Sequence, residues 1–336
     1  NTKIHVGLFD LTPFANFEIF AENALHELQK ICTANIKNEI GKCTYTQMLN
    51  SDGGIETDLT VICLDKNYFR IISSAATRER DKFHIKKHIS SDIELKDVTD
   101  DFCVFGLFGP KSRDLIKSLS NDNFENNDFK FATAKFIYIE GIKIWIQRLS
   151  YVGELGYELY VKFKDAKKIY ELIVEVGKKF NLSNCGMHTM DVLRMESGFL
   201  HWGHDISPQE NQYESGLNFL ISLKKNFDFI GKESLLKIKD KKLNKRFIML
   251  FLKKSKPGEP LILHDEPIYL DNKIIGVTTS GKYSFNFNKN LSFGYIKSDY
   301  SNLELSKKNL FIEIEKIKYP AEVLLNPLKQ TDFKKM

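Results

Sequence analysis

The segment from Ser150 to Glu158 reads Ser-Tyr-Val-Gly-Glu-Leu-Gly-Tyr-Glu, and Leu-Tyr-Val follows it. Its two glycines, Gly153 and Gly156, predict a turn that leads into a strand, because glycine tolerates backbone angles that other residues avoid. Alternation along that strand puts Glu158 and Tyr160 on one face. A carboxylate among aromatic rings is costly to bury without a hydrogen-bond donor. Glu158 is therefore either a solvated strand residue or a residue that binds a ligand.

A second block of motifs follows between Cys185 and Lys232. It contains Gly186-Met187-His188, Asp191-Val192-Leu193-Arg194-Met195-Glu196-Ser197-Gly198-Phe199, Trp202-Gly203-His204-Asp205-Ile206, Glu214-Ser215-Gly216-Leu217 and Phe229-Ile230-Gly231-Lys232. Together with the Tyr151–Glu158 turn that precedes them, these motifs occur in an order that resembles the glycine-cleavage T-protein family. It looks closest to the branch fused to flavin amine dehydrogenases, such as dimethylglycine and sarcosine dehydrogenases.

The resemblance covers nearly the whole chain. The matching pieces are an early strand, a hairpin on the folate side, a central Gly-Pro-x-Ser-Arg turn and a motif of the carboxy-terminal barrel: 6–11, 45–50 with 53–61, 108–113 and 276–281. It implies an α+β architecture, in which a T-protein-like folate-binding fold of mixed α/β subdomains is followed by a small C-terminal β-barrel.

The hydrophobic patterns agree with an α+β fold, because strands and helices mix without regular βαβ repeats. They predict helices over 21–31, 78–88, 111–119, 166–180 and 187–197, and strands over 45–50, 55–64, 69–73, 103–108, 136–139 and 142–146. A lysine-rich connector over 237–245 then leads to short strands over 246–252, 260–263, 267–270, 274–278, 291–296 and 310–314. We expect a folate-binding, aminomethyltransferase-like domain over 1–240 and a β-barrel over 241–336, with the boundary near Asp240.

The resemblance also implies the site residues. Asp58 matches the family's aspartate at the reactive edge of tetrahydrofolate, where it is the catalytic candidate. There a carboxylate can stabilise an iminium cation, orient the folate and accept a proton while a folate nitrogen attacks the carbon. Glu158 matches the glutamate that binds the pterin edge by charge-assisted hydrogen bonds. Tyr151 matches an aromatic bordering the pterin, and Tyr45 is a weaker folate-binding candidate. The implied partners are folate and an N-methylated amine or its iminium.

Two positions depart from the family pattern. Glycine-cleavage T-proteins carry an arginine where Met190 stands, and they place a tyrosine near the carboxy terminus where Phe333 aligns. Both departures favour the dehydrogenase-fused branch over a glycine-cleavage role. A non-catalytic module that binds folate or a partner protein, and a free-standing folate-dependent demethylase, remain alternatives.

Composition excludes several function classes. The net charge of +5 comes mostly from scattered lysines, which is not the basic stripe of a nucleic-acid-binding protein. Five cysteines without a C-x-x-C pair argue against a disulfide framework or a metal site, and they fit a reducing compartment. We expect a cytoplasmic protein, or a mitochondrial-matrix protein in a eukaryote. The chain has no apolar run long enough for a membrane span.

The sequence gives no sign of binding a dinucleotide itself, because no G-x-G-x-x-G opens a strand–turn–helix unit. FAD is therefore expected only on a domain ahead of Asn1, or on a partner protein. Arg194 and Asp191 are three residues apart, which fits an ordinary surface bridge or a buried ion pair equally well. For His204 and Asp205 we expect a structural role.

Overall fold

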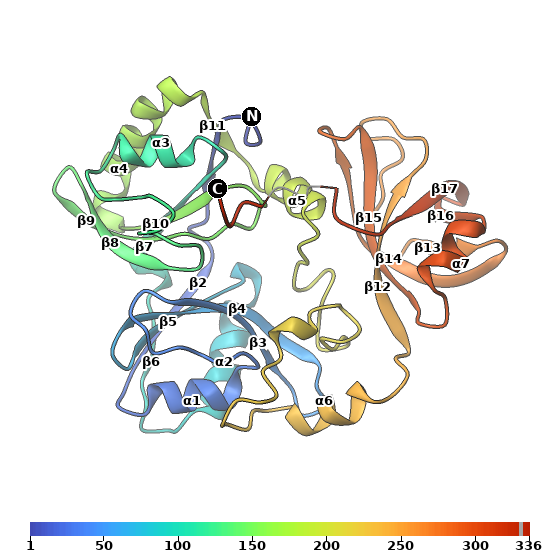
Figure 1. The fold of residues 1–336 in the computed structure, drawn as a ribbon, viewed down its shortest axis with the longest axis horizontal. Coiled ribbons are helices and arrows are strands. Elements are labelled where there is room, and N and C mark those ends of the chain that lie inside the picture. Colours follow the sequence, from blue (N-terminus) through green and yellow to red (C-terminus); the bar gives the residue numbers. More distant parts are fainter. Residues whose placement is uncertain (329–331) are drawn as a thin grey trace.

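The computed structural model describes residues 1–328 and 332–336. Two stacked β-sheets and a closed barrel surround a central loop region (Figure 1). The upper sheet has the strand order β11 (Leu182–Cys185), β1 (Val6–Asp10), β7 (Phe102–Phe108), β10 (Gly156–Lys162), β9 (Ile142–Gln147) and β8 (Ala134–Ile139). Only the pair β1 and β11 is parallel among these strands.

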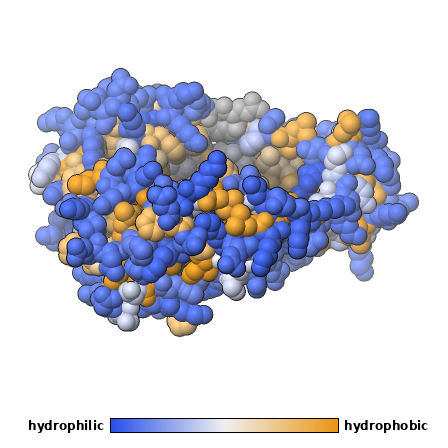
Figure 2. Space-filling model, turned by 60° about the horizontal axis from the view of Figure 1, so that its bottom comes forward, coloured by the Kyte–Doolittle hydropathy of each residue, from blue (hydrophilic) through white to orange (hydrophobic). Residues whose placement is uncertain are grey.

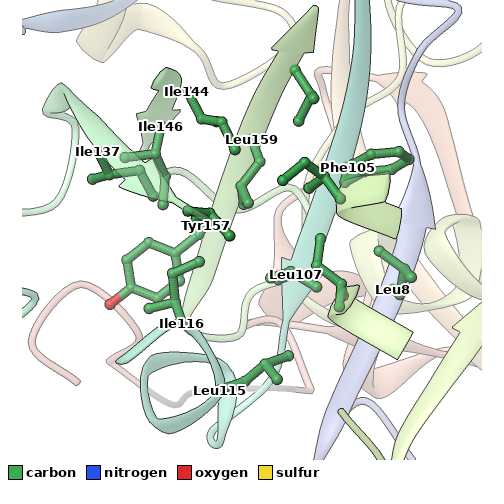
Figure 3. Packing of buried hydrophobic residues seen from close by; sticks show 14 of the residues in the cluster. Leu8, Phe105, Leu107, Leu115, Ile116, Ile137, Ile144, Ile146, Tyr157 and Leu159 are labelled. Atoms are coloured by element: carbon green, nitrogen blue, oxygen red, sulfur yellow. The ribbon is translucent and has the colours of Figure 1, made fainter. Parts of the chain in front are cut away.

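Two helices, α3 (Ser112–Lys117) and α4 (Phe163–Gly177), cover the outer face of the upper sheet. Tyr157 and Leu159 of β10 lie in the apolar cluster beneath them, together with Ile144 and Ile146 of β9 (Figure 3). Because neighbouring strand residues point to opposite faces, Glu158 and Tyr160 lie on the other face, as the alternation predicts.

The lower sheet is antiparallel throughout. Its order is β3 (Cys43–Leu49), β4 (Ile55–Asp65), β5 (Tyr68–Ser73), β2 (Ala15–Phe20) and β6 (Leu95–Asp97). Helices α1 (Ala24–Ile31) and α2 (Arg78–His88) pack on the outer face, against Leu59, Val61 and Cys63 of β4. The alternate residues of β4, among them Asp58 and Ile62, therefore face the upper sheet.

One apolar cluster joins the facing surfaces of the two sheets. Phe9, Val104, Phe108, Trp145 and Tyr160 contribute from the upper sheet, Cys43 and Ile62 from the lower, and Met190 and Leu193 from α5 (Met187–Glu196). The layer order is thus helices, sheet, sheet, helices. The candidate carboxylates Asp58 and Glu158 lie in the inner layer, on opposite sheets.

Helix α6 (Lys232–Lys239) leads to a closed barrel with the order β12 (Lys245–Leu252), β15 (Lys289–Lys297), β14 (Lys273–Ser284), β13 (Pro267–Leu270), β16 (Leu310–Ile314) and β17 (Ile317–Leu324), and with helix α7 (Asn302–Lys307). The predicted α+β architecture with a small carboxy-terminal β-barrel is confirmed. The boundary near Asp240 falls between α6 and β12 and stays a prediction.

Two local predictions were wrong, and some strands were not predicted. The start of the lysine-rich connector is the end of α6, which buries Leu235. Residues 260–263 form no strand, because Ile262 packs its side chain against Gly281 instead of joining the ladder. Strand β17 was missed because it contains Pro320, which lacks an N–H; its carbonyl still accepts a bond from Lys253.

Arg194 attaches the barrel to the sheets. It is 1% exposed and donates to Asp191 (2.8 Å), to Asp205, and to Ser280 of β14 (2.8 Å). Asp205 also accepts from Thr279 and Ser280. Arg194 therefore belongs to a buried ion-pair network, which settles the two alternatives for this residue, and Asp205 has a structural position.

The surface in Figure 2 is mostly hydrophilic, with hydrophobic residues in several separate groups. Among the described residues, no helix is both long enough and apolar enough to cross a bilayer.

Candidate functional site

Asp58 is held in place by two donors from the strand beside it. The Tyr45 hydroxyl and the Gln47 amide both donate to Asp58 Oδ1, at 2.8 and 2.9 Å. Burial raises the pKa of Asp58 from 3.8 to about 6, against the opposing effect of these two hydrogen bonds. The carboxylate is thus ionised at neutral pH, but it gains a proton under mildly acidic conditions.

The register of the β3–β4 hairpin brings these side chains together. Gln47 lies directly opposite Asp58, and the register shifts at Met48 and Leu49, near the turn. In that turn Gly54 approaches the Pro208 carbonyl so closely that a Cβ would lie 2.0 Å from the oxygen. The hairpin tip is therefore clamped against the 206–210 segment, which also bonds to Ile55.

Glu158 has a matching arrangement on the upper sheet. The Gln147 amide donates to Glu158 Oε2 at 2.6 Å, and the Tyr160 hydroxyl lies 3.5 Å from the same oxygen. Gln147 is opposite Glu158 in the β9–β10 ladder and is completely buried. Burial raises the pKa of Glu158, and the bonds from Gln147 and Tyr160 oppose that shift.

Both carboxylates keep one oxygen open. Over residues 1–328 and 332–336, the protein donors to Asp58 use Oδ1 and those to Glu158 use Oε2. Some side-chain polar atoms of this part of the chain are fully buried without a hydrogen-bond partner. Asp58 Oδ2 and Glu158 Oε1 are not among them. Each carboxylate is therefore oriented by the protein and still has an oxygen that can accept a hydrogen bond from a ligand.

Tyr151 borders the same region. Its hydroxyl donates to the Leu200 carbonyl at 2.9 Å, and its ring stacks on Phe199 with an interplanar angle of 21°. Burial raises the pKa of Tyr151, and the charge of Asp58 adds to that rise. The close approach of Gly156 to the Leu149 carbonyl, which would lie 2.5 Å from an added Cβ, keeps this turn compact.

The four predicted residues lie in one neighbourhood. The charge of Asp58 raises the pKa values of both Tyr45 and Tyr151, and the charge of Glu158 raises that of Cys43, two positions before Tyr45 on β3. The sequence interpretation missed Gln47, Gln147 and Phe199. For the two glutamines, the available signal was their position across a ladder from each carboxylate.

The two departures from the family pattern lie in different surroundings. Met190 is 2% exposed and belongs to the apolar cluster between the sheets. Phe333 packs edge-on against Phe199, with ring centroids 6.1 Å apart, and thereby joins the aromatic group around Tyr151. A methionine at position 190 supplies apolar contact and no charge for an anionic group.

Comparison with known families gives the class of this protein. Residues 1–225 match the GCVT N-terminal domain, and residues 245–329 match the glycine cleavage T-protein C-terminal barrel domain. The chain belongs to the glycine cleavage T-protein family.

Relatives of two lengths share this similarity. An aminomethyltransferase of Halothermothrix orenii is 31% identical over 94% of the chain and 87% of its own length. The mitochondrial dimethylglycine dehydrogenase of Rattus norvegicus and the formaldehyde-forming 4-methylaminobutanoate oxidase of Paenarthrobacter nicotinovorans are each 32% identical, over 97% and 96% of the chain. The chain spans only 38% of the length of either.

The solved structure of aminomethyltransferase T from Bartonella henselae has the same fold. Its TM-score is 0.85 at 21% identity, over 98% of this chain and 87% of that one.

Proposed function

We propose that this protein catalyses tetrahydrofolate-dependent one-carbon transfer, with the folate bound between the two sheets. The observation that carries the proposal is the pair of oriented carboxylates on facing strands, each with one oxygen open to a ligand. Family membership supports it, because a relative of which the chain covers 87% is an aminomethyltransferase.

The donor set fits a reduced pterin. Glu158 Oε1 can accept an N–H of the pterin edge, while Gln147 keeps the carboxylate in place through Oε2. The ring of Tyr151, braced by Phe199, offers an apolar wall for a flat heterocycle. When bound, tetrahydrofolate supplies the nitrogen nucleophiles that take up the one-carbon unit.

Asp58 carries the chemical role in this proposal. Its ionised carboxylate stabilises a cationic iminium carbon nearby, accepts the proton that the attacking nitrogen releases and can pass that proton to the departing amine nitrogen. Tyr45 and Gln47 hold Oδ1, so that Oδ2 faces the reacting groups without rotation of the side chain. The pKa of about 6 leaves Asp58 available as both an anion and a proton acceptor near neutral pH.

We further propose that the chain acts as the folate part of a flavin-dependent N-methyl amine dehydrogenase of the dimethylglycine or sarcosine type. Support comes from the longer relatives, a dimethylglycine dehydrogenase and a methylaminobutanoate oxidase, of which the chain matches about one third. Met190 and Phe333 agree with that branch. In this arrangement the iminium passes to the folate site inside the protein, away from water that would hydrolyse it.

Calorimetry and product analysis test the folate site. Tetrahydrofolate should bind at micromolar levels or tighter, about 8 kcal/mol. Glu158→Gln should weaken binding by about 1.5–3 kcal/mol, because a charged hydrogen bond becomes neutral. Asp58→Asn should bind folate normally and form little methylenetetrahydrofolate from a formaldehyde–amine adduct.

Asp92→Asn, at an exposed loop position, is the matched control and should leave both properties unchanged. If the heat of titrating the wild-type chain with millimolar tetrahydrofolate equals that of the buffer control, the proposed folate binding is refuted. Binding without any product in the wild-type chain would favour a non-catalytic folate-binding module.

The flavin assignment has its own test. The purified chain should be colourless and should not reduce a dye in the presence of dimethylglycine or sarcosine, since a separate domain is proposed to carry the flavin. Stoichiometric flavin absorbance in this chain would overturn that assignment.

A further inference from the structure

A cavity opens between the two sheets, beyond Glu158. Its volume is about 590 Å³, and its lining includes Leu64 and Asp65 at the end of β4, Arg70, Phe102, Tyr160 and Lys162. Asp58 lies about 20 Å away from Leu64 along β4, at about 3.3 Å per residue. We call this space the rear cavity, because a folate bound from Glu158 towards Asp58 would extend away from it.

Two of the residues that line the rear cavity, Arg70 and Trp145, each have a buried donor without an acceptor among the described residues. Arg70 and Trp145 are 5% and 4% exposed, and over the described residues Arg70 Nη1 and Trp145 Nε1 have no hydrogen-bond partner. The other nitrogens of Arg70 bind Glu18. A buried donor without an acceptor is destabilising, so two of them in one cavity wall call for a ligand that accepts hydrogen bonds.

The rim is positively charged and aromatic. Lys96, Lys143 and Lys162 are exposed and have no carboxylate partner within residues 1–328 and 332–336. The carboxylates of the lining are Asp65, Asp101 and Glu18, and Glu18 is paired with Arg70. Phe136 is 48% exposed, and its ring packs edge-on against Trp145 at 4.8 Å. Lysines lie over Phe136 and Phe102, at 4.0 and 4.1 Å from the ring centroids.

We propose that the rear cavity is a second binding site, for a small planar carboxylate. The carboxylate would accept hydrogen bonds from Arg70 Nη1 and Trp145 Nε1 and would neutralise the lysines at the rim, while its ring would pack on Phe136 and Tyr160. Phe136 packs against Trp145, and the Arg70 guanidinium lies over the Phe102 and Tyr160 rings, so these side chains would have to shift for the carboxylate to reach the two donors. The rear cavity adjoins the proposed folate site at Tyr160, whose hydroxyl accepts a hydrogen bond from Gln147 at 3.0 Å.

The test uses the whole chain with two probes of one shape, 2-naphthoate and uncharged 2-naphthalenemethanol. Calorimetry should show that naphthoate binds at least tenfold more tightly than the alcohol. The double variant Lys143→Gln/Lys162→Gln should weaken naphthoate binding at least fivefold and leave tetrahydrofolate binding intact. Lys164→Gln/Lys168→Gln, with the same charge change at exposed positions of α4, is the matched control and should bind both normally.

Trp145→Phe provides an independent readout, because it removes one donor and retains an aromatic ring. The change in tryptophan emission on naphthoate addition should disappear in this variant, and naphthoate affinity should fall about fivefold. Equal affinity for the two probes, no binding at millimolar naphthoate, or unchanged binding in Lys143→Gln/Lys162→Gln would overturn the proposal. Naphthoate binding that is lost in Glu158→Gln but kept in the lysine variant would assign the probe to the folate site and overturn it equally.

Discussion

Asp58→Asn should make the protein more stable at pH 8 while it removes the proposed activity. Burial raises the pKa of Asp58 from 3.8 to about 6. That is a shift of about 2 pH units, at about 1.4 kcal/mol each. Ionised Asp58 therefore destabilises the folded state by about 3 kcal/mol. Asparagine can keep both protein hydrogen bonds through Oδ1 and place its amide at the open Oδ2 position.

The sign follows from linkage. The pKa of Asp58 is higher in the folded state than in the unfolded state. Its contribution to the unfolding free energy is therefore fully present below pH 3.8 and is lost as the pH rises through about 6. The increase in unfolding free energy caused by Asp58→Asn should thus be near zero at pH 4 and should grow between pH 4 and 6. Above that range it should stay at about 3 kcal/mol or less. Urea denaturation at pH 4, 6 and 8 measures it, with Asp92→Asn as the exposed control. No gain at pH 8, or an equal gain at pH 4, would refute the reasoning.

Three further outcomes are expected. The rate of one-carbon transfer should fall about tenfold per pH unit below pH 6, where Asp58 becomes protonated, and a profile without an inflection near pH 6 would exclude Asp58 as the titrating group. Arg194→Met should destabilise the fold by about 3–5 kcal/mol in denaturation experiments, because it leaves the buried carboxylate of Asp205 without its cation; a loss below about 1 kcal/mol would contradict this. Ser301→Ala removes the capping box of α7 and should lower the unfolding free energy by about 1 kcal/mol, whereas Ser306→Ala at the other end of the helix should have less effect.

Much of the fold and part of the site could be predicted from local sequence. The glycine turn and the alternation after it placed Glu158 and Tyr160 on the face opposite Leu159, as the two apolar clusters confirm. Counting outward from the predicted strand ends, 50 and 55, pairs Gln47 with Asp58; Gln47 was missed because cross-strand pairing alone does not show that its amide bonds to the carboxylate. The contact between Arg194 and Ser280 could not be predicted from local sequence either, because Ser280 lies on a barrel strand far along the chain.

The two carboxylates of the site are oriented by the same kind of local contact. Each receives its amide donor from the residue directly across its own antiparallel ladder, and each of these contacts spans 11 residues. Contacts between near neighbours in the chain close short loops and form early in folding. Each half of the site is therefore assembled within a hairpin-sized unit, and tertiary folding only has to bring two finished halves face to face. A chain that fails to dock its sheets would retain both oriented carboxylates and have no shared site.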